Sequence, residues 1–463
     1  MARERNTEQK RRKTPPRSLF QSAPAQVMAP RLMVILSTLA LLAIGLVMVY
    51  SSSSITSYVE EGDALGETLK QCAFALLGIV GAVVIALFAK QDAMQGMPGV
   101  IFWAICCALI LITALLGTVG LGAKRWLIIG PISIQISEFA KIAFVMMAAR
   151  IAAQYREGEI DSGAAAKLAI GMVLLPLGFV FIAQSDMGTT MICCIGLFSV
   201  VVLSGLSGRA TAVLVGLGIV FGLIAVLSKS YRADRLGSFA DPWADAQGTG
   251  YQLVHSFKAL ASGGLLGAGI GNSYEKLQYL PEAETDFIFA IIGEELGLVG
   301  ALLVIIAFLV FMRGGFLIAS QASTPFGSLL AAGLTVMIVF QAFLNISCVV
   351  GLFPTTGKPL PFISSGGSSL LSSLALVGVL LSISFDSNNE GEYRQRRDNL
   401  QVVSRVSPTD RSGRGGRNSE GRDVRARRSS SLERDGYPSL HIVRGGKAPV
   451  YATEVRATRT QRR

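Results

Sequence analysis

Ten runs of about 20 apolar residues follow one another along the chain, and this repetition limits what it can fold into. A helix needs roughly 20 apolar residues to cross a bilayer, so the sequence predicts an all-α polytopic membrane protein with about ten transmembrane helices. Only 16% of the residues are charged, against about 25% in soluble proteins, which excludes a single soluble domain. The predicted spans are residues 32–51, 70–89, 99–118, 130–150, 165–183, 188–205, 209–228, 285–312, 325–349 and 365–385.

The charged residues are segregated to the two ends of the chain. Of the net charge of +11, residues 1–31 contribute +6, residues 386–463 contribute +8, and the stretch between them contributes −3. Basic flanks of transmembrane helices stay on the cytoplasmic side. Both termini are therefore predicted to be cytoplasmic, which requires an even number of spans and agrees with ten.

This pattern predicts three parts: a basic cytoplasmic N-terminal tail (1–31), a ten-helix membrane domain (32–385) and a disordered basic cytoplasmic C-terminal tail (386–463). Within the membrane domain, the loop at residues 229–284, between the seventh and eighth helices, is far longer than the others and is predicted to be extracytoplasmic. The C-terminal tail is expected to lie near anionic membrane lipids, with a docking site as the alternative. No nucleic-acid partner is expected, because no aromatic residues alternate with its arginines.

Polar residues interrupt the apolar chain in four places, and each place falls in a loop predicted to lie on the outer face. An extracytoplasmic functional site is therefore the first hypothesis. The four clusters are residues 122–126 with 135–141, residues 184–188, the long loop through Asp286, and residues 351–369.

Glu138 and Lys141 form the clearest pair of ionisable residues inside a predicted span. They are three residues apart and so share one face of a helix, about one-third of the way into the bilayer by helical rise. Ionisable residues in a span face a cavity or a partner. Two interpretations remain open, a mutually neutralising structural pair and a role in shaping a polar cavity.

Asp286 stands where the long loop meets the eighth span. Apolar neighbours on its C-terminal side would raise the pKa of its carboxyl group toward that of a useful base. The alternative is an N-cap, because Asp and Thr commonly precede an apolar helix. Asp186, before the sixth span, carries the same ambiguity.

Four basic residues lie on the outer side, against the positive-inside rule: Lys124, Arg125, Arg232 and Arg235. Guanidinium groups match phosphate oxygens well, so an anionic ligand is one explanation, and ordinary contact with lipid headgroups is the other.

The glycine run from Gly263 to Gly271 has no βαβ context and is expected to form apolar turns. With only two histidines and no CxxC pair, no metal site is expected.

Taken together, the motifs from about residue 120 to 370 resemble the SEDS family (shape, elongation, division and sporulation), and in particular its cell-division FtsW type. The sequence departs from the family at Ser185, Ser365 and Glu284, where members usually have proline, an aromatic residue and often histidine. The matching motifs are GAKRW, QxSExxK at 135–141, QSDMG, DPWxD, GNSYEKLxYLPEAETDFIFAIIGEELG, and PTTGxPLPFISSGGSS.

The resemblance implies the SEDS fold and a peptidoglycan glycosyltransferase in the cell membrane, acting at the division septum. Such an enzyme polymerises lipid II by an inverting displacement of undecaprenyl diphosphate. It implies Asp286 as the general base and Lys124, Arg125, Arg232 and Arg235 as diphosphate ligands. Gln135, Glu138, Lys141, Asp186 and Ser368 would shape the cavity.

The resemblance also implies partners: a class B penicillin-binding transpeptidase and other division proteins. A divalent cation, Mg²⁺ or Mn²⁺, at the diphosphate is a further expectation, although no ligand cluster in the sequence demonstrates one. Two other classes of function stay open from the residues themselves. These are a flippase for a lipid-linked precursor and a division scaffold without catalysis.

Overall fold

The structure of the protein is a computed structural model. It describes residues 25–120, 123–129, 132–205, 216, 237–398, 401–404 and 440–443. The chain divides into two compact units, residues 1–388 and 389–463, and each is described by itself.

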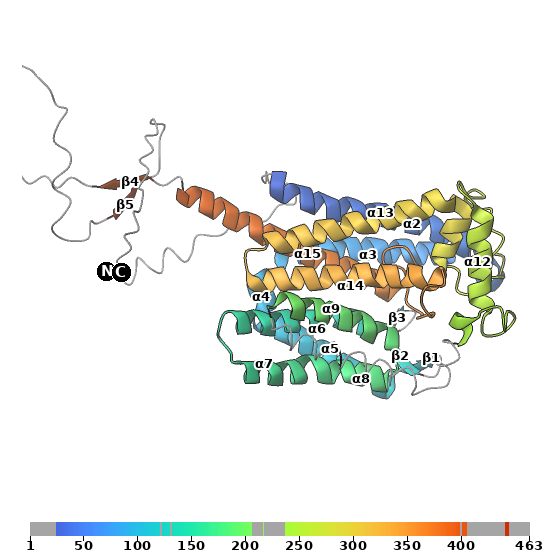
Figure 1. Cartoon of the computed structure of the whole chain (residues 1–463), viewed down its shortest axis with the longest axis horizontal. Coiled ribbons are helices and arrows are strands. Elements are labelled where there is room, and N and C mark those ends of the chain that lie inside the picture. The colour runs from blue at the N-terminus through green and yellow to red at the C-terminus, as the bar shows by residue number, and fades with distance from the viewer. Residues whose placement is uncertain are drawn as a thin grey trace, which may run out of the picture. The chain divides into compact units, whose positions relative to one another are not determined.

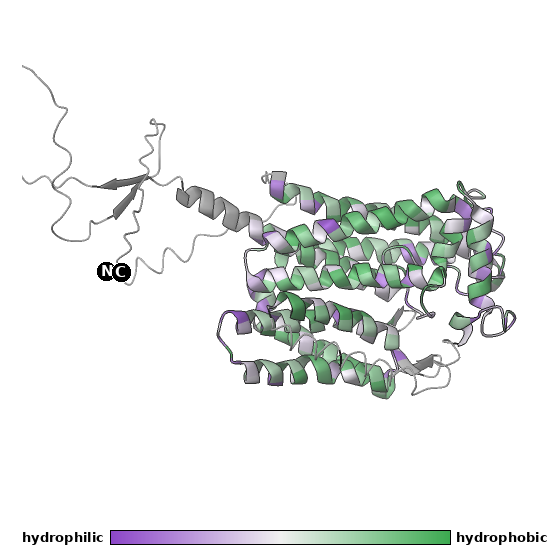
Figure 2. Ribbon diagram, viewed as in Figure 1, coloured by the Kyte–Doolittle hydropathy of each residue, from purple (hydrophilic) through white to green (hydrophobic). Residues whose placement is uncertain are grey.

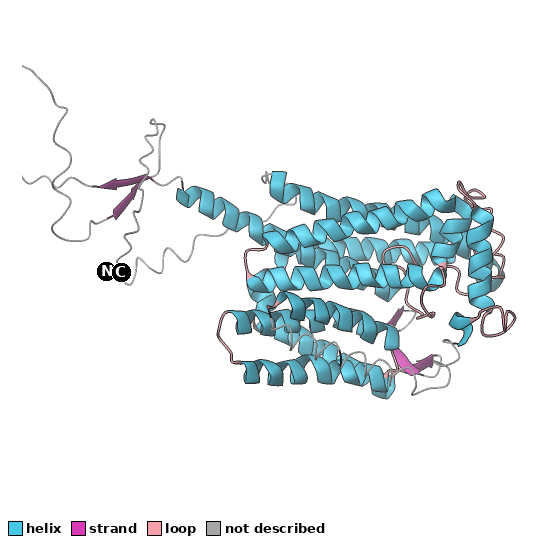
Figure 3. Cartoon of the chain, viewed as in Figure 1, coloured by secondary structure: helices cyan, strands magenta, loops and turns pink. Residues whose placement is uncertain are grey.

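The first unit is a bundle of long apolar helices (Figures 1, 2 and 3). Nine of the ten predicted spans coincide with helices, and the predicted span at 209–228 lies outside the described residues except at Gly216. The all-α membrane fold is thereby confirmed. The bounds are α2 Ala25–Glu61, α3 Gly66–Phe88, α4 Gln91–Gln95, α5 Met97–Leu116, α6 Ile136–Arg156, α7 Ser162–Ala169, the π-helix η1 Ile170–Leu174, α8 Leu175–Ala183, α9 Met187–Leu203, α12 Tyr251–Gly263, α13 Ile288–Gln321, α14 Pro325–Val349 and α15 Gly367–Asp398.

Seven helices in the described part of the chain are long and apolar enough to cross a membrane, and α9 is a shorter apolar helix. In the most apolar stretch of each helix, only 17–28% of the residues are buried in α3, α5 and α7–α8, against 83% in α14 and α15. The first three therefore present most of their surface outward, whereas α14 and α15 form the centre of the bundle.

Helix α6 is more polar than these, yet it is buried along nearly its whole length. It packs against α5, α9 and α14. A polar helix is stable at such a place only if its charged groups find partners inside the protein. The partners of α6 therefore mark the region where a site is to be sought.

Helix α6 begins at Ile136, six residues later than the predicted fourth span. The residues before it form an antiparallel sheet, β1 Thr118–Gly120, β2 Ala123–Ile129 and β3 Ile132–Ile134, in the order β1-β2-β3. The β-branched isoleucines of β2 and β3 favour this extended backbone. Consequently Glu138 and Lys141 lie in the first two turns of α6, nearer to the end of the bundle than predicted.

Helix α13 is broken at Gly297, where φ is 67°. The glycine run after α12 fills the break: Ala268 N–H donates to Glu294 O (2.9 Å) and Gly269 N–H donates to Glu295 O (3.0 Å). On the other side of the break, Leu298 N–H donates to Gly264 O (3.0 Å). The run is thus more than a set of turns, because it supplies partners to backbone groups that the broken helix leaves unpaired.

The C-terminal end of α15 reaches Asp398, beyond the predicted boundary at residue 385. In the second unit, two short strands, β4 Gln401–Ser404 and β5 Leu440–Val443, pair in an antiparallel manner.

Candidate functional site

Asp286 is half-buried in the turn that leads into α13, at the end of the bundle that carries α12 and the strands β1–β3 (Figure 1). The N-cap of α13 is Phe287, whose side chain makes no capping hydrogen bond. Asp286 stands one residue before this N-cap, and its part in capping the helix stays a prediction.

The segment between α14 and α15 wraps around the backbone at Asp286. Asn345 Nδ2 donates both to Asp286 O (2.8 Å) and to Lys358 O (2.9 Å). Ser364 Oγ donates to Thr285 O (2.5 Å). A side chain at Gly357 would bring its Cβ to 3.6 Å from Asp286 Oδ2, so the main chain at Gly357 passes directly beside the carboxylate.

From Gly357 the chain continues into Lys358, whose side chain is 5% exposed. Its Nζ lies 3.3 Å from Glu138 Oε1 and 3.2 Å from Asp186 Oδ1, and it donates to Thr189 Oγ1 (2.5 Å). We call Lys358, Glu138, Lys141, Asp186 and Thr189 the Lys358 cluster. It joins α6, the start of α9 and the segment before α15 into one buried ionic network.

For Asp186 the capping interpretation is confirmed, and its other role is that of an ion-pair partner with a lowered pKa rather than a base with a raised one. Its Oδ1 accepts from Thr189 N–H (3.0 Å) and so caps α9, and it also pairs with Lys358. Gly188 allows this arrangement, because a Cβ there would lie 2.6 Å from Lys358 Cγ. Because the glycine of the QSDMG motif has no side chain, the side chain of Lys358 has room to reach Glu138 and Asp186.

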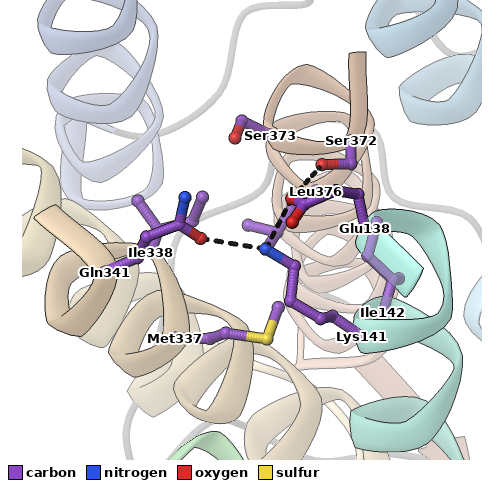
Figure 4. Close-up of a pocket in the computed structure, with 9 residues that line it drawn as sticks. All are labelled: Glu138, Lys141, Ile142, Met337, Ile338, Gln341, Ser372, Ser373 and Leu376. Atoms are coloured by element: carbon purple, nitrogen blue, oxygen red, sulfur yellow. Dashed lines mark hydrogen bonds and ion pairs between the residues drawn. The ribbon is translucent and has the colours of Figure 1, made fainter. Parts of the chain in front are cut away.

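Glu138 and Lys141 form the predicted ion pair, at 2.8 Å. Lys141 Nζ also donates to Gln341 Oε1 on α14 (2.9 Å), and Ser372 on α15 lies against Glu138. These groups line a cavity of about 10 Å³ (Figure 4), room for a single water molecule. The pair thus neutralises itself and also borders a small polar cavity.

Gln135 and Ser368 belong to the same network. Gln135 Nε2 donates to Asp186 Oδ2 (2.7 Å), and its backbone N–H donates to Ser368 Oγ (3.0 Å). All five residues expected to shape the cavity are therefore brought together, at the end of the bundle where Asp286 lies.

The charges of the Lys358 cluster stabilise one another. Burial disfavours the charged form of Lys358, but Asp186 and Glu138 outweigh it and hold the pKa of the ammonium above its usual value. Burial likewise opposes ionisation of Asp186, yet Lys358, the Thr189 N–H and Arg125 lower its pKa. Both groups are therefore charged at neutral pH.

The predicted diphosphate ligands are less completely described. Arg125 donates from Nε to Gln184 O and from Nη2 to Ser185 O, each at 2.8 Å, which fixes β2 to the end of α8. Arg232, Arg235 and the side chain of Lys124 lie outside the described residues. Their part in binding an anion stays a prediction.

Two of the departures from the family pattern meet in space. Ser365 N–H donates to Glu284 O (2.8 Å), and Ser365 Oγ donates to Glu67 Oε1 (2.6 Å). At the third departure, Ser185 adopts φ of 52°, which proline does not adopt. A relative with proline at this position must follow a different backbone path before α9.

Lys358 is the main residue of the site that sequence reasoning missed. A signal was present, since it is the only charged residue in the segment PTTGKPLPFISSGGSS. Gln341 was also missed, because α14 carries other polar residues, among them Thr335 and Asn345, and nothing local distinguishes Gln341 from them.

Comparison with known proteins agrees with this architecture. The profile of the FtsW, RodA and SpoVE family of cell cycle proteins matches residues 31–389. Stage V sporulation protein E of Bacillus subtilis is 36% identical over 371 residues, which cover 77% of this chain and 97% of that protein. A probable peptidoglycan glycosyltransferase FtsW of Synechocystis is 38% identical over 353 residues, which cover 75% and 88%.

Solved structures show the same fold. Rod shape determining protein RodA of Thermus thermophilus superposes with a TM-score of 0.57 at 21% identity, over 80% of this chain and 99% of that chain. A chain of a peptidoglycan synthase complex that coordinates polymerization and crosslinking gives a TM-score of 0.62 at 24% identity, over 80% and 99%. From its motifs, its helices and these matches, the chain belongs to the SEDS family of cell cycle proteins that comprises FtsW, RodA and SpoVE.

Proposed function

We propose that the protein is a peptidoglycan glycosyltransferase that polymerises lipid II into glycan strands, with Asp286 as the general base. The observation that supports this most strongly is the position of Asp286, which lies beside Gly357 and is joined to the backbone of Lys358 through Asn345. The relatives named probable peptidoglycan glycosyltransferase FtsW support the reaction class.

The reaction turns an α-linked diphosphate into a β-1,4 glycosidic bond, so it inverts configuration in a single displacement. Such a displacement needs a base that takes the proton of the acceptor hydroxyl and cations that stabilise the leaving diphosphate. A half-buried carboxylate held by its backbone suits the first task. Arg125, which also donates to Gln184 O and Ser185 O, is the described candidate for the second task, together with Lys124, Arg232 and Arg235 from the sequence.

The substrate is amphiphilic, and its sugars are used outside the cell. We place the Asp286 end of the bundle on the extracytoplasmic side and both termini in the cytoplasm, because basic tails are retained inside. Action at the division septum is supported by the FtsW-type motifs. A class B penicillin-binding transpeptidase is the proposed partner, supported by the likeness to a chain of a synthase complex.

A divalent cation at the diphosphate stays a prediction. Among the residues that the structure describes, no three His, Cys, Asp or Glu side chains lie close enough to hold a metal ion. These residues alone therefore do not make a metal site, and we derive no step through one.

The test is polymerisation of lipid II by the full-length purified protein, with the length of glycan chains as the readout. Asp286→Asn keeps the size of the side chain but removes the base, so the rate is expected to fall by about 10²- to 10⁴-fold. Asp63→Asn, an exposed aspartate in the first loop, is the matched control and should polymerise like the wild type.

Polymerisation by Asp286→Asn at the wild-type rate would show that the base is wrongly assigned. If the wild type forms no glycan but moves lipid II across vesicle membranes, and Asp286→Asn does so too, the flippase is the correct function. If neither activity is found and Asp286→Asn still rescues division in depleted cells, the scaffold is correct.

A further inference from the structure

A second buried ionic cluster lies outside the site described above. Lys276 Nζ pairs with Glu295 Oε1 at 2.9 Å, and Ser51 Oγ of α2 donates to the same carboxylate at 2.7 Å. The neighbouring Glu294 accepts from Ser273 Oγ (2.5 Å). We call Lys276, Glu294, Glu295, Ser273 and Ser51 the Lys276 clamp. Each of them is less than 5% exposed.

A clamp of this composition is costly to build. Two carboxylates and one ammonium are removed from water, and the attraction between them offsets that cost only when the remaining lone pairs are also satisfied. Here Ser51, Ser273 N–H (3.3 Å to Glu295) and Tyr274 N–H (2.8 Å to Glu294) supply the additional donors. Such complete satisfaction fixes the backbone of residues 273–276 tightly on α13.

The clamp closes a loop in which Asp286 sits. Lys276 precedes Asp286 and Glu295 follows it, so their ion pair ties together the two chain segments that flank the proposed base. Between them the backbone is held in turns: Leu280 N–H donates to Glu275 O (2.9 Å) and Phe287 N–H donates to Glu282 O (3.1 Å).

On its other side, Asp286 is held by Asn345 through its carbonyl oxygen. On this same side Ser364 Oγ donates to Thr285 O and Ser365 N–H donates to Glu284 O, so the segment between α14 and α15 holds three successive carbonyl groups of the turn. The clamp supplies the second support, because it anchors residues 273–276 to α13 and, through Ser51, to α2. Two supports on opposite sides define the direction in which the carboxylate points.

We propose that Lys276 and Glu295 are positioning residues for glycosyl transfer, which hold the segment 273–287 on the first turns of α13 and thereby orient Asp286. This inference rests on the proposed function of Asp286. Neither residue acts on the reacting atoms directly. Each acts through the backbone that carries Asp286.

The test measures initial rates of lipid II polymerisation by the full-length chain carrying Lys276→Met, Glu295→Gln or both. Because a small displacement of a catalytic group costs up to about 10²-fold, we expect kcat to fall by about 10- to 100-fold, with KM within about twofold of wild type. The double variant should lose about as much as either single variant, because the two residues act as one unit. Lys276→Arg, which keeps the charge, should recover part of the rate.

The pH profile separates positioning from a simple loss of folded protein. A smaller folded fraction lowers the rate equally at every pH. A displaced Asp286 has different surroundings, so the midpoint of the acid limb of kcat should move by about half a pH unit or more. Lys258→Met, on the exposed face of α12, is the matched control and should change neither quantity.

Wild-type kcat and an unmoved acid limb in well-folded Lys276→Met would overturn the proposal. If the single variants do not fold, the double variant, which leaves no unpaired buried charge from this pair, decides in the same way. Asp286→Asn is assayed in parallel. If it polymerises like the wild type, the proposed function fails. If it is inactive while the clamp variants polymerise like the wild type, only the positioning inference fails.

Discussion

The Lys358 cluster and the Lys276 clamp each pair a buried lysine with buried carboxylates, two for Lys358 and one for Lys276, and they are assembled differently. Lys358 finds Glu138 and Asp186 at sequence separations of 220 and 172 residues. Lys276 finds Glu295 only 19 residues away. The first network exists only when α6, α9 and the segment before α15 have come together, whereas the ion pair of the second closes within one stretch of chain, to which α2 adds Ser51.

The two networks also differ in what they border. Glu138 and Lys141 line the cavity of Figure 4, and no clamp residue does. The Lys358 cluster contains two lysines and two carboxylates and is balanced in charge, while the clamp has one lysine for two carboxylates. A charge-balanced network beside this cavity suits a part of the site itself, and a fully satisfied network away from the cavity suits a support.

Removing the lysine of each network should have the largest effects on stability and should show which network contributes more to it. Lys358→Met leaves two buried carboxylates without their shared cation, so we expect a loss of about 3–5 kcal/mol in the free energy of unfolding. Polymerisation should also become undetectable. Lys276→Met deprives one carboxylate of its cation and should cost less. Thermal unfolding in detergent measures both, and an equal or reversed order would show that the networks do not differ in this way.

Gly297→Ala should disturb the clamp through the backbone. The residue has φ of 67°, and a Cβ would lie 2.5 Å from Leu265 O, an atom of the main chain that is unable to rotate away. We expect a loss of about 2–3 kcal/mol, and faster proteolysis of the glycine run. Gly178→Ala on α8, where nothing lies within 4 Å, should be neutral or slightly stabilising.

Gly188→Ala should disturb the Lys358 cluster, but less strongly. Its Cβ would lie 2.6 Å from Lys358 Cγ, so the lysine must shift, but this atom belongs to a side chain and not, as at Gly297, to the main chain. We expect a loss of about 1–2 kcal/mol, again against Gly178→Ala as the control. If Gly188→Ala proves more harmful than Gly297→Ala, side-chain packing matters more here than the backbone at the break of α13.

The smallest effect concerns pH. The lowered pKa of Asp186 means that its contribution to stability is present above the unfolded value of about 3.9 and is lost as the pH falls. The raised pKa of Lys358 means that its contribution is present below about 10.4 and is lost as the pH rises.

Between about pH 5 and pH 9 the Lys358 cluster should therefore leave the melting temperature unchanged. Below pH 5, Asp186→Asn should lose less stability per pH unit than the wild type, because it has no carboxyl group to protonate at this position. A melting temperature that falls equally steeply in both proteins would contradict the lowered pKa of Asp186.

Much of the fold follows from the sequence because a bilayer imposes one simple rule on apolar length. The same rule failed at residues 132–134, where an apolar run is a strand rather than the start of a helix, since hydropathy alone does not distinguish the two. It also gave no hint that α6, with its ionisable residues, would lie in the interior.

The site was predicted in part. Glu138, Lys141, Asp186, Gln135 and Ser368 were found because polar residues inside apolar stretches are conspicuous. Lys358 was missed because its importance depends on contacts across the fold, and local sequence does not show which carboxylates a lysine reaches. The clamp was invisible for a related reason: Glu294 and Glu295 looked like ordinary polar residues near a helix start.

The break in α13 also has a consequence for how the protein is made. The carbonyl groups of Glu294 and Glu295 are paired by Ala268 and Gly269, which leave the ribosome before α13 does. The nascent chain thus already carries the backbone groups that the broken helix requires when α13 reaches the membrane. Moving the glycine run behind α13, by circular permutation, would reverse this order and expose unpaired carbonyls during insertion, where each costs several kcal/mol.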